Sequence, residues 1–327
     1  METSPALSRW LLGPRSDPSV RLRMLTEVQG ADARDPRVLA AQRSIGREGW
    51  AARVLQEQLP SGNWATPGTT GSQLYRPKYI ATNWRMIVLA DLGMTQRDRR
   101  IRAMLDLVTR RWGGPRGALG GSESETCITG NALRAFLRFG YTETVEVDRM
   151  VRWLLRAQKA DGGWHCFPSA RGTLDAWEGL AAFAFLPPSR RTPAVERSIE
   201  RGAEFFLKRR LFREGTARYE PWWRIHYPQH YYYDLLVGLD TLTRLGYGAD
   251  RRLDPALRWL SSKCDGAGRW RLDVAHPDLL PDGLYQPEPP YYPFVLESPG
   301  RPSRWATVSA LAIRALVAAA RASRSAT

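Results

Sequence analysis

The sequence predicts an all-α protein folded as a ring of about five to six helical hairpins. Two kinds of helical segment alternate along its 327 residues. One kind is amphipathic and charged on one face, and the other is apolar on nearly all sides. A Gly-rich turn that ends in tryptophan recurs between them, and no stretch of useful length alternates as a β-strand does. Apolar inner helices enclosed by amphipathic outer helices account for these observations.

The recurring turn gives the period of the repeat. Trp64, Trp164 and Trp270 each follow a glycine by two residues, and glutamine stands six residues before the first two of them. The first two tryptophans are 100 residues apart and the next two 106, so each interval holds two units of about 50 residues. Because a unit of this length cannot bury its apolar face alone, we expect the units to close into an α/α toroid.

Proline, aspartate and glycine mark the helix ends. Asp17 and Asp35 each precede a proline, as is typical of a helix start, and Gly93 follows an apolar run as a C-terminal glycine does. Residues 1–17 and 321–327 are expected to be flexible, which leaves residues 18–320 as a single toroid domain with an irregular proline-rich segment at 277–302. Helices are expected at residues 18–28, 36–59, 78–92, 97–111, 126–139, 146–158, 174–185, 193–210, 230–245, 255–263 and 305–320.

The chain is strongly basic. Its 48 Lys and Arg against 33 Asp and Glu give a net charge of +15, which attracts anionic partners. The alternative is a genome of high G+C content that favours arginine everywhere, since the arginines are scattered. Three cysteines do not make a disulfide framework. We find no secretory leader, membrane-spanning run or nucleic-acid motif, so a cytoplasmic protein that does not bind nucleic acid is expected.

Residues 158–164 and their copy at 58–64 resemble the Gln-Trp (QW) repeat of the terpene cyclase and protein prenyltransferase superfamily. The resemblance covers about residues 20–320 and implies the same toroid, in which glutamine and tryptophan join neighbouring hairpins. It also implies an isoprenoid or similar hydrophobic substrate in a central cavity, with peripheral membrane contact because isoprenoids partition into lipid. The Asp-x-Asp-Asp acid motif of the cyclases has no match, and residues 175–178, Asp-Ala-Trp-Glu, come nearest to it.

Asp175 and Glu178 are the candidate acid. Residues three apart share a helical face, and two carboxyl groups in an apolar cavity cannot both ionise cheaply. One would keep its proton near neutral pH, as a general acid requires. The alternative is that Asp175 caps the helix with Glu178 as its partner.

His230 and Asp234 form a second predicted polar centre, since one helical turn lets a carboxylate orient an imidazole. His230 also stands where the prenyltransferases have their zinc-binding histidine, although no Asp-x-Cys pair accompanies it. His165, Cys166 and His230 include zinc-ligand types. An adjacent His and Cys are an awkward pair for one metal, however, so packing is the stronger interpretation and no cofactor is predicted.

Aligning the apolar helices on their closing residues places polar side chains at one shared position near their starts: Thr82, Thr129, Asp175, Asp234 and Thr307. Unpaired polar groups are costly on apolar helices, which favours a ligand there. Aromatic faces around these positions could stabilise a carbocation, or could line a sugar or peptide groove. The predicted ligand-binding residues are Thr82, Trp84, Arg85, Thr129, Asn131, His165, Trp177, His226, Tyr233 and Trp305.

Three functions fit these features. The first is a cyclase-like or prenyltransferase-like enzyme that uses acid catalysis on a hydrophobic or anionic ligand in a central aromatic cavity. The second is a lyase or binding protein for acidic polysaccharide, which the net charge suits. The third is a non-catalytic toroid scaffold that binds a peptide or protein.

Overall fold

The computed structural model describes residues 3–64, 74–75, 78–113, 118–119, 121, 124–276 and 295–325. In these ranges β-pairing is confined to isolated bridges, and the predicted all-α class is confirmed. The α-helices are α1 Pro5–Leu12, α2 Pro18–Arg23, α3 Pro36–Ile45, α4 Gly49–Gln56, α5 Thr82–Asp91, α6 Arg99–Trp112, α7 Thr126–Phe139, α8 Val145–Ala157, α9 Glu178–Phe183, α10 Pro193–Lys208, α11 Leu235–Arg244, α12 Asp254–Ser262 and α13 Arg304–Ser325. A π-helical turn spans Met24–Val28, and 3₁₀ turns span Leu174–Ala176, Pro188–Arg190, Glu220–Trp223, Tyr247–Ala249 and Arg251–Leu253.

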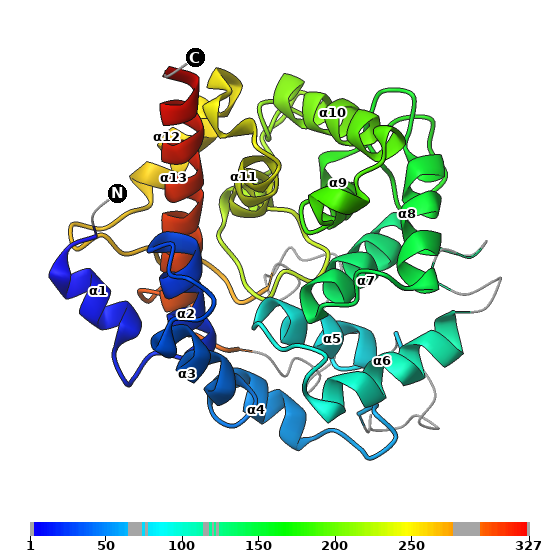
Figure 1. Ribbon diagram of the computed structural model, residues 1–327. Helices are drawn as coiled ribbons and strands as arrows, with labels where there is room; N and C mark the ends of the chain where they lie inside the picture. The colour runs from blue at the N-terminus through cyan, green and yellow to red at the C-terminus, as the bar shows by residue number, and fades with distance from the viewer. Residues whose placement is uncertain are drawn as a thin grey trace.

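Inner and outer helices alternate along the chain. From α5 onward each inner helix contacts the next, in the order α5, α7, α9, α11, α13, and α13 also contacts α2 near the start of the chain. The even-numbered helices from α4 to α12 lie at the periphery (Figure 1). The described helices thus surround a common centre, whereas their complete closure into a toroid remains a prediction.

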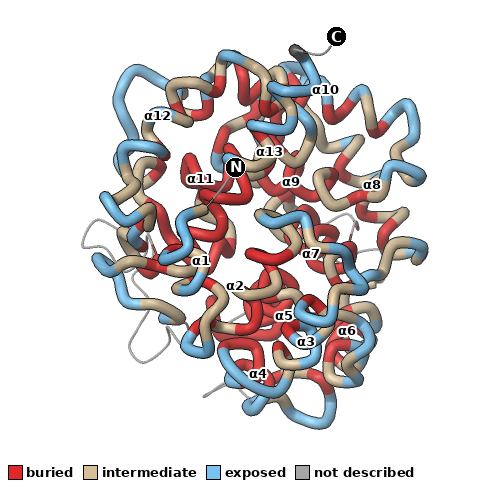
Figure 2. The backbone as a smooth tube through the Cα atoms, turned by 60° about the vertical axis from the view of Figure 1, so that its left-hand side comes forward, coloured by how far each residue is buried: buried red, intermediate tan, exposed pale blue. Residues whose placement is uncertain are grey.

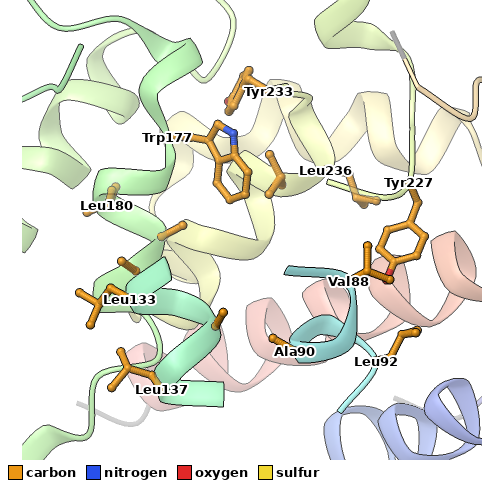
Figure 3. Close-up of a cluster of buried hydrophobic side chains, with 14 of the residues drawn as sticks. Val88, Ala90, Leu92, Leu133, Leu137, Trp177, Leu180, Tyr227, Tyr233 and Leu236 are labelled. Carbon is orange, nitrogen blue, oxygen red and sulfur yellow. The ribbon is translucent and has the colours of Figure 1, made fainter. Parts of the chain in front are cut away.

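The two layers differ in burial because their sequences differ. All ten residues of α5 are buried, whereas α8 buries only Val147, Met150 and Leu154, which recur at helical spacing on one face. Figure 2 shows the buried backbone concentrated in the inner helices. One hydrophobic cluster extends from Leu7 to Val317, and Figure 3 shows the part where α7 and α9 meet.

Each of the three Trp-containing turns has the same kind of hydrogen bond. The indole N–H of Trp64, Trp164 and Trp270 donates to the carbonyl ten residues earlier, at 2.8, 2.9 and 2.7 Å. All three turns favour glycine, because Gly62, Gly162 and Gly268 have φ of 91°, 93° and 77°. At Gly62 and Gly162 a Cβ would also lie 2.4 Å from a carbonyl oxygen of the next outer helix. The tryptophan therefore fixes the turn to its own helix, and the glycine lets the next helix approach.

The glutamines of the first two turns reach that next outer helix. Nε2 of Gln58 donates to the Arg100 carbonyl of α6 at 3.0 Å, and Nε2 of Gln158 donates to the Ser198 carbonyl of α10 at 2.9 Å. In the third turn Cys264 takes this place, and its Sγ contacts the carbonyl of the adjacent Asp265.

The proline-led starts at Asp17 and Asp35 are confirmed, and both carboxylates accept hydrogen bonds from the first turn of their helices. The single helix predicted at 36–59 is wrong. The chain breaks before α4 at Gly49, whose φ is 75°, and Oδ2 of Asp17 accepts the Trp50 amide at 2.7 Å. Asp17 thus serves two helix starts.

Three inner helices are shorter than predicted. The helix expected from residue 78 begins at Thr82, after Tyr79 adopts a left-handed φ of 69°. The helix expected from residue 230 begins at Leu235, because the Asp234 side chain accepts the Val237 amide and caps it there. The helix expected at 174–185 divides into a 3₁₀ turn and α9.

Both chain ends predicted to be flexible contain helix in the described residues. Residues 5–12 form α1, which buries Leu7 and Leu11, and α13 continues to Ser325. Residues 326–327 and most of the predicted irregular segment, 277–294, lie outside the described ranges. By length and composition alone α13 could cross a membrane, and half of its apolar window is buried inside the protein.

Candidate functional site

Among the described residues, the clearest candidate for a chemical role is the carboxyl of Glu178, which lies where the starts of α7 and α9 meet. Glu178 is the first residue of α9 and is 1% exposed. Neither of its carboxyl oxygens has a hydrogen-bond partner among the described residues. A buried carboxyl without a partner is costly when ionised, which indicates a group kept for a purpose other than stability.

Burial raises the pKa of Glu178 well above its ordinary value, and the nearby Cys166 adds to the rise. The guanidinium of Arg134 on α7 opposes it. Arg134 lies 4.9 Å from the centre of the Trp177 ring and donates to the Gln229 carbonyl at 3.4 Å. Burial thus favours the protonated form of the Glu178 side chain, and a buried positive charge lies nearby to stabilise the carboxylate once the proton leaves.

Close helix packing fixes the backbone of Glu178. A Cβ on Gly130 of α7 would lie 2.5 Å from the Glu178 carbonyl oxygen, and a Cβ on Gly179 would lie 2.6 Å from the Trp164 ring. The two glycines thus let α9 fit between α7 and the second Trp-containing turn. The start of α9 is held on both sides, as a positioned catalytic group requires.

Two thiols adjoin the carboxyl. Cys127, at the start of α7, contacts Cys166, and this contact together with burial raises the pKa of Cys127 well above its ordinary value. The Thr126 hydroxyl donates to the His165 carbonyl at 3.1 Å, which holds the segment containing Cys166 against α7. The neighbourhood of Glu178 is thus formed by two segments far apart in sequence.

An aromatic cluster is the second part of the site. Tyr79 stacks on Tyr231 and on His230, with ring centres 6.2 and 5.3 Å apart, and Trp84 packs against the same rings. The indole N–H of Trp177 donates to the Tyr231 carbonyl at 3.3 Å. Trp177, the residue before Glu178, therefore links the acid to the cluster.

Three of the four histidines lie in this cluster. His276 was not predicted, yet its ring centre lies 5.7 Å from that of His230 and 6.2 Å from that of His226. No pattern in the sequence points to it, because it comes from a connection 46 residues beyond His230. Burial lowers the pKa of His230 to about 3 and that of His276 well below its ordinary value, so both rings are neutral.

Asp234 is brought to His226 and not to His230, which corrects the predicted pairing. Its Oδ2 lies 2.8 Å from Nδ1 of His226, although out of line for a hydrogen bond, and accepts the Gln229 amide at 2.9 Å. The predicted spacing assumed a helix across residues 230–234, but α11 begins only after Asp234. The Asn131 amide donates to the His230 carbonyl at 2.5 Å and so holds this connection on α7.

Asp175 differs from Glu178 in its surroundings, although its charge adds to the rise of the Glu178 pKa. It is an exposed residue of the 3₁₀ turn, and its Oδ1 accepts the Trp222 indole N–H at 2.8 Å in an open pocket of about 430 Å³. Loss of water around the carboxyl raises its pKa, and the Trp222 bond opposes the rise. Because the residue still reaches solvent through the open pocket, this shift is small in energy. The predicted helix cap is formed by Thr173, which accepts the Asp175 amide.

Several polar residues of the predicted site form hydrogen bonds to other residues of the chain. Thr129 donates to the Ala118 carbonyl, Thr307 to the Ser303 carbonyl and Tyr233 to the Leu211 carbonyl. Thr82 is buried at the start of α5, and Trp84 donates to the Tyr75 carbonyl. Arg85 is buried beside Glu57, with its Nη1 2.5 Å from the carboxylate, and also donates to the Ile80 carbonyl.

The centre of the helix ring is charged and narrow. A cavity of about 50 Å³ lies there, and its lining includes Arg134, Arg138, Asp91 and Trp305. Glu27 pairs with both Arg23 and Arg244, which lie around this centre. Such a space holds a water molecule or two and no hydrocarbon chain. A larger ligand cavity at the centre therefore stays a prediction.

In the described ranges no three His, Cys, Asp or Glu side chains are arranged to hold a metal ion. His165, Cys166 and His230 are the residues considered above as zinc-ligand types. Nδ1 of His165 accepts the Phe167 amide at 3.0 Å, and Cys166 contacts Cys127. His230 stacks on Tyr79. The three residues are therefore engaged in separate contacts.

No family model matches the chain, and no curated protein matches it. Among solved structures it is similar to a protein from Actinoplanes, with 17% identity over 94% of this chain and 92% of that one and a TM-score of 0.45. It is also similar to the type II terpene cyclase MstE from Scytonema, with 16% identity over 82% of this chain and 95% of that one and a TM-score of 0.31. A complex of an MstE variant with geranylgeranyl dihydroxybenzoate gives a TM-score of 0.29. These TM-scores are all below 0.5, and neither a fold assignment nor a residue role is taken from them.

Proposed function

We propose that this chain is a terpene cyclase-like enzyme that protonates a carbon–carbon double bond of an isoprenoid or similar hydrophobic substrate, on a toroid closed by its helical hairpins. The observation that carries the proposal is the Glu178 carboxyl, which is buried and without a partner among the described residues, and whose pKa burial raises well above its ordinary value. A general acid must hold its proton at the working pH, and burial shifts this group in that direction.

Glu178 would transfer its proton to an alkene carbon, which leaves a carboxylate on the protein and a carbocation on the substrate. Arg134 stabilises the carboxylate, and the aromatic faces of Trp177, Tyr79 and Trp84 stabilise the cation where no hydrogen bond can. The reaction ends when the cation loses a proton to a base. We assign this step to the neutral ring of His230, which is buried in the same cluster.

The other predicted residues support this site. Asp234 positions the 226–234 connection through His226 and Gln229, and Asn131 holds it on α7. A hydrophobic substrate reaches such a site from a lipid phase, so peripheral membrane contact by a cytoplasmic protein belongs to the same proposal.

The experiment is turnover of geranylgeraniol in D₂O by the full chain. Protonation of the alkene followed by proton loss gives an isomeric product that carries one deuterium, which mass spectrometry detects. We expect Glu178→Gln to lower the rate by about 10²- to 10⁴-fold, because the amide has no acidic proton to give. Glu200→Gln, the same change at an exposed position of α10, should retain the wild-type rate.

The Asp175→Asn variant tests whether Asp175 or Glu178 is the general acid. We expect it to retain most of the rate, since Asp175 faces Trp222 in the open pocket. A loss as large as that of Glu178→Gln would return the acid role to Asp175. Full activity of Glu178→Gln would refute the mechanism, and the absence of a deuterated product from all of these proteins would favour the scaffold function.

A further inference from the structure

A second pocket, separate from the Glu178 site, opens to solvent beside α12 and the Glu220–Trp223 turn. Its volume is about 510 Å³, within the range of roughly 300–1,000 Å³ typical of small-molecule sites. Its walls carry Arg218, Trp223 and Arg224 from the turn and its flanks, and Trp259 and Lys263 from α12 and its end. Cations and tryptophans therefore line one hollow.

Most charges in this pocket are already paired. Arg218 pairs with Glu220, with 2.5 Å between Nε and Oε1, and Lys263 pairs with Asp273 at 2.7 Å. Asp273 also accepts the Ile225 amide at 2.8 Å. Arg224 has neither an ion pair nor a side-chain hydrogen bond among the described residues, although it is half-buried in the pocket wall. The pocket thus has one unmatched positive charge among the residues that the structure describes.

The tryptophans form a corner next to this charge. The rings of Trp223 and Trp259 meet at 84° with their centres 6.3 Å apart. The guanidinium of Arg218 lies 4.2 Å from the centre of the Trp223 ring, and the Lys263 ammonium lies 5.8 Å from that of Trp259. Two indole rings therefore border this pocket, with Arg218 and Lys263 lying against them.

We propose that this pocket binds an acidic sugar of the hexuronate class. One unpaired guanidinium matches one carboxylate, which it can hold through two parallel hydrogen bonds. The indole faces can pack against the C–H groups of a pyranose ring. Glu220 and Asp273 can accept hydrogen bonds from sugar hydroxyls, whereas they would repel a ligand with several negative charges such as a diphosphate.

The pocket has a neighbour that suits a longer chain of the same sugar. Arg218 also lines the pocket of about 430 Å³ that contains Asp175, together with Tyr219 and Trp222. The hexuronate could therefore come as a free monosaccharide or as one unit of an acidic oligosaccharide. The two sources differ in whether the neighbouring pocket contributes to binding.

Isothermal titration calorimetry of the full chain with galacturonate tests the proposal. We expect binding of galacturonate, at least tenfold weaker binding of galactose, and about tenfold weaker galacturonate binding by Arg224→Gln, since a charge-assisted bidentate contact is lost. Arg224→Lys keeps the positive charge but lacks the two parallel N–H donors of arginine, so its affinity for galacturonate should lie between those of the wild type and Arg224→Gln. Tetragalacturonate should bind more tightly than the monomer if the oligosaccharide is the source, and equally if the free sugar is.

Arg258→Gln is the matched control, because Arg258 is exposed on α12 outside the pocket lining and its loss changes the net charge equally. It should bind galacturonate as the wild type does. Thermal unfolding checks that the variants are folded, which we expect because the Arg224 side chain has no described polar contact. Absence of galacturonate binding at millimolar concentration, unchanged binding by Arg224→Gln, or tighter binding of inorganic phosphate than of galacturonate would each overturn the proposal.

Discussion

At the scale of single residues, environment separates groups that look equivalent in the sequence. Asp175 and Glu178 are three residues apart, yet one lies in an open pocket against Trp222 and the other is buried beside Cys166. Their different surroundings, and not their spacing, decide which one keeps its proton. His226 and His230 differ in the same way, because only His226 lies beside Asp234.

The raised pKa of Glu178 has a consequence for stability. Above the ordinary pKa of about 4.5 the unfolded chain releases this proton while the native protein keeps it, so the free energy of unfolding falls as the pH rises through that region. Glu178→Gln removes this fall. We expect the variant to gain stability relative to the wild type as the pH rises above 4.5, measured by urea unfolding at several pH values.

The buried histidines act in the opposite direction, since the unfolded chain binds protons below pH 6.5 while His230 stays neutral to about pH 3. The contribution of the histidines is the same in the wild type and in Glu178→Gln, so it cancels when their free energies of unfolding are compared. Parallel stability curves for the wild type and Glu178→Gln would contradict a raised pKa at residue 178.

At the scale of elements, the Trp-containing turns are joints between hairpins. The same turn geometry occurs three times, but only the first two copies carry a glutamine that reaches the next outer helix. The glycine and tryptophan thus build the turn, and the glutamine adds the connection.

Removal of that connection should be measurable. Gln158→Ala leaves the Ser198 carbonyl and hydroxyl without the partner they have at 2.9 Å, and we expect a loss of about 1–3 kcal/mol in the free energy of unfolding. Cys264→Ala, the same position in the third turn, should lose less, because the side-chain hydrogen bond of Cys264 in the described residues goes to its own neighbour Asp265 and not to another helix. Equal losses would mean that the glutamine bonds do not hold the hairpins together.

At the scale of the whole molecule, the two ends of the chain belong to the core. Leu11 of α1 is fully buried, and Nε of Arg304 at the start of α13 donates to the Trp10 carbonyl at 3.2 Å. The N-terminal helix therefore covers the region where the last helix begins, and α13 in turn contacts α2. Contacts between the ends are what a ring requires.

We expect Leu11→Ala to lower the free energy of unfolding by about 2–5 kcal/mol, as is typical when a buried leucine is truncated. Leu59→Ala, at a leucine that is 40% exposed, should cost less than about 1 kcal/mol. Chemical unfolding of the three proteins measures both. A small effect at Leu11 would mean that α1 is dispensable for the core, as its proline- and serine-rich sequence first suggested.

Local patterns in the amino-acid sequence were enough to predict the all-α class, the alternation of inner and outer helices and the helix starts at Asp17 and Asp35. These depend on local signals, namely helical periodicity and the capping chemistry of a few side chains. The same signals placed Glu178 and His230 among the candidate residues.

Which of these residues meet follows from the tertiary structure alone. The pairing of Asp234 with His226, the approach of His276 and the different surroundings of Asp175 and Glu178 each depend on where connections outside the helices turn, which periodicity does not encode. Burial is likewise a property of the packed protein, and burial raises the pKa of Glu178 and lowers that of His230. The chemistry of the site therefore follows from the way distant segments close around a few polar side chains.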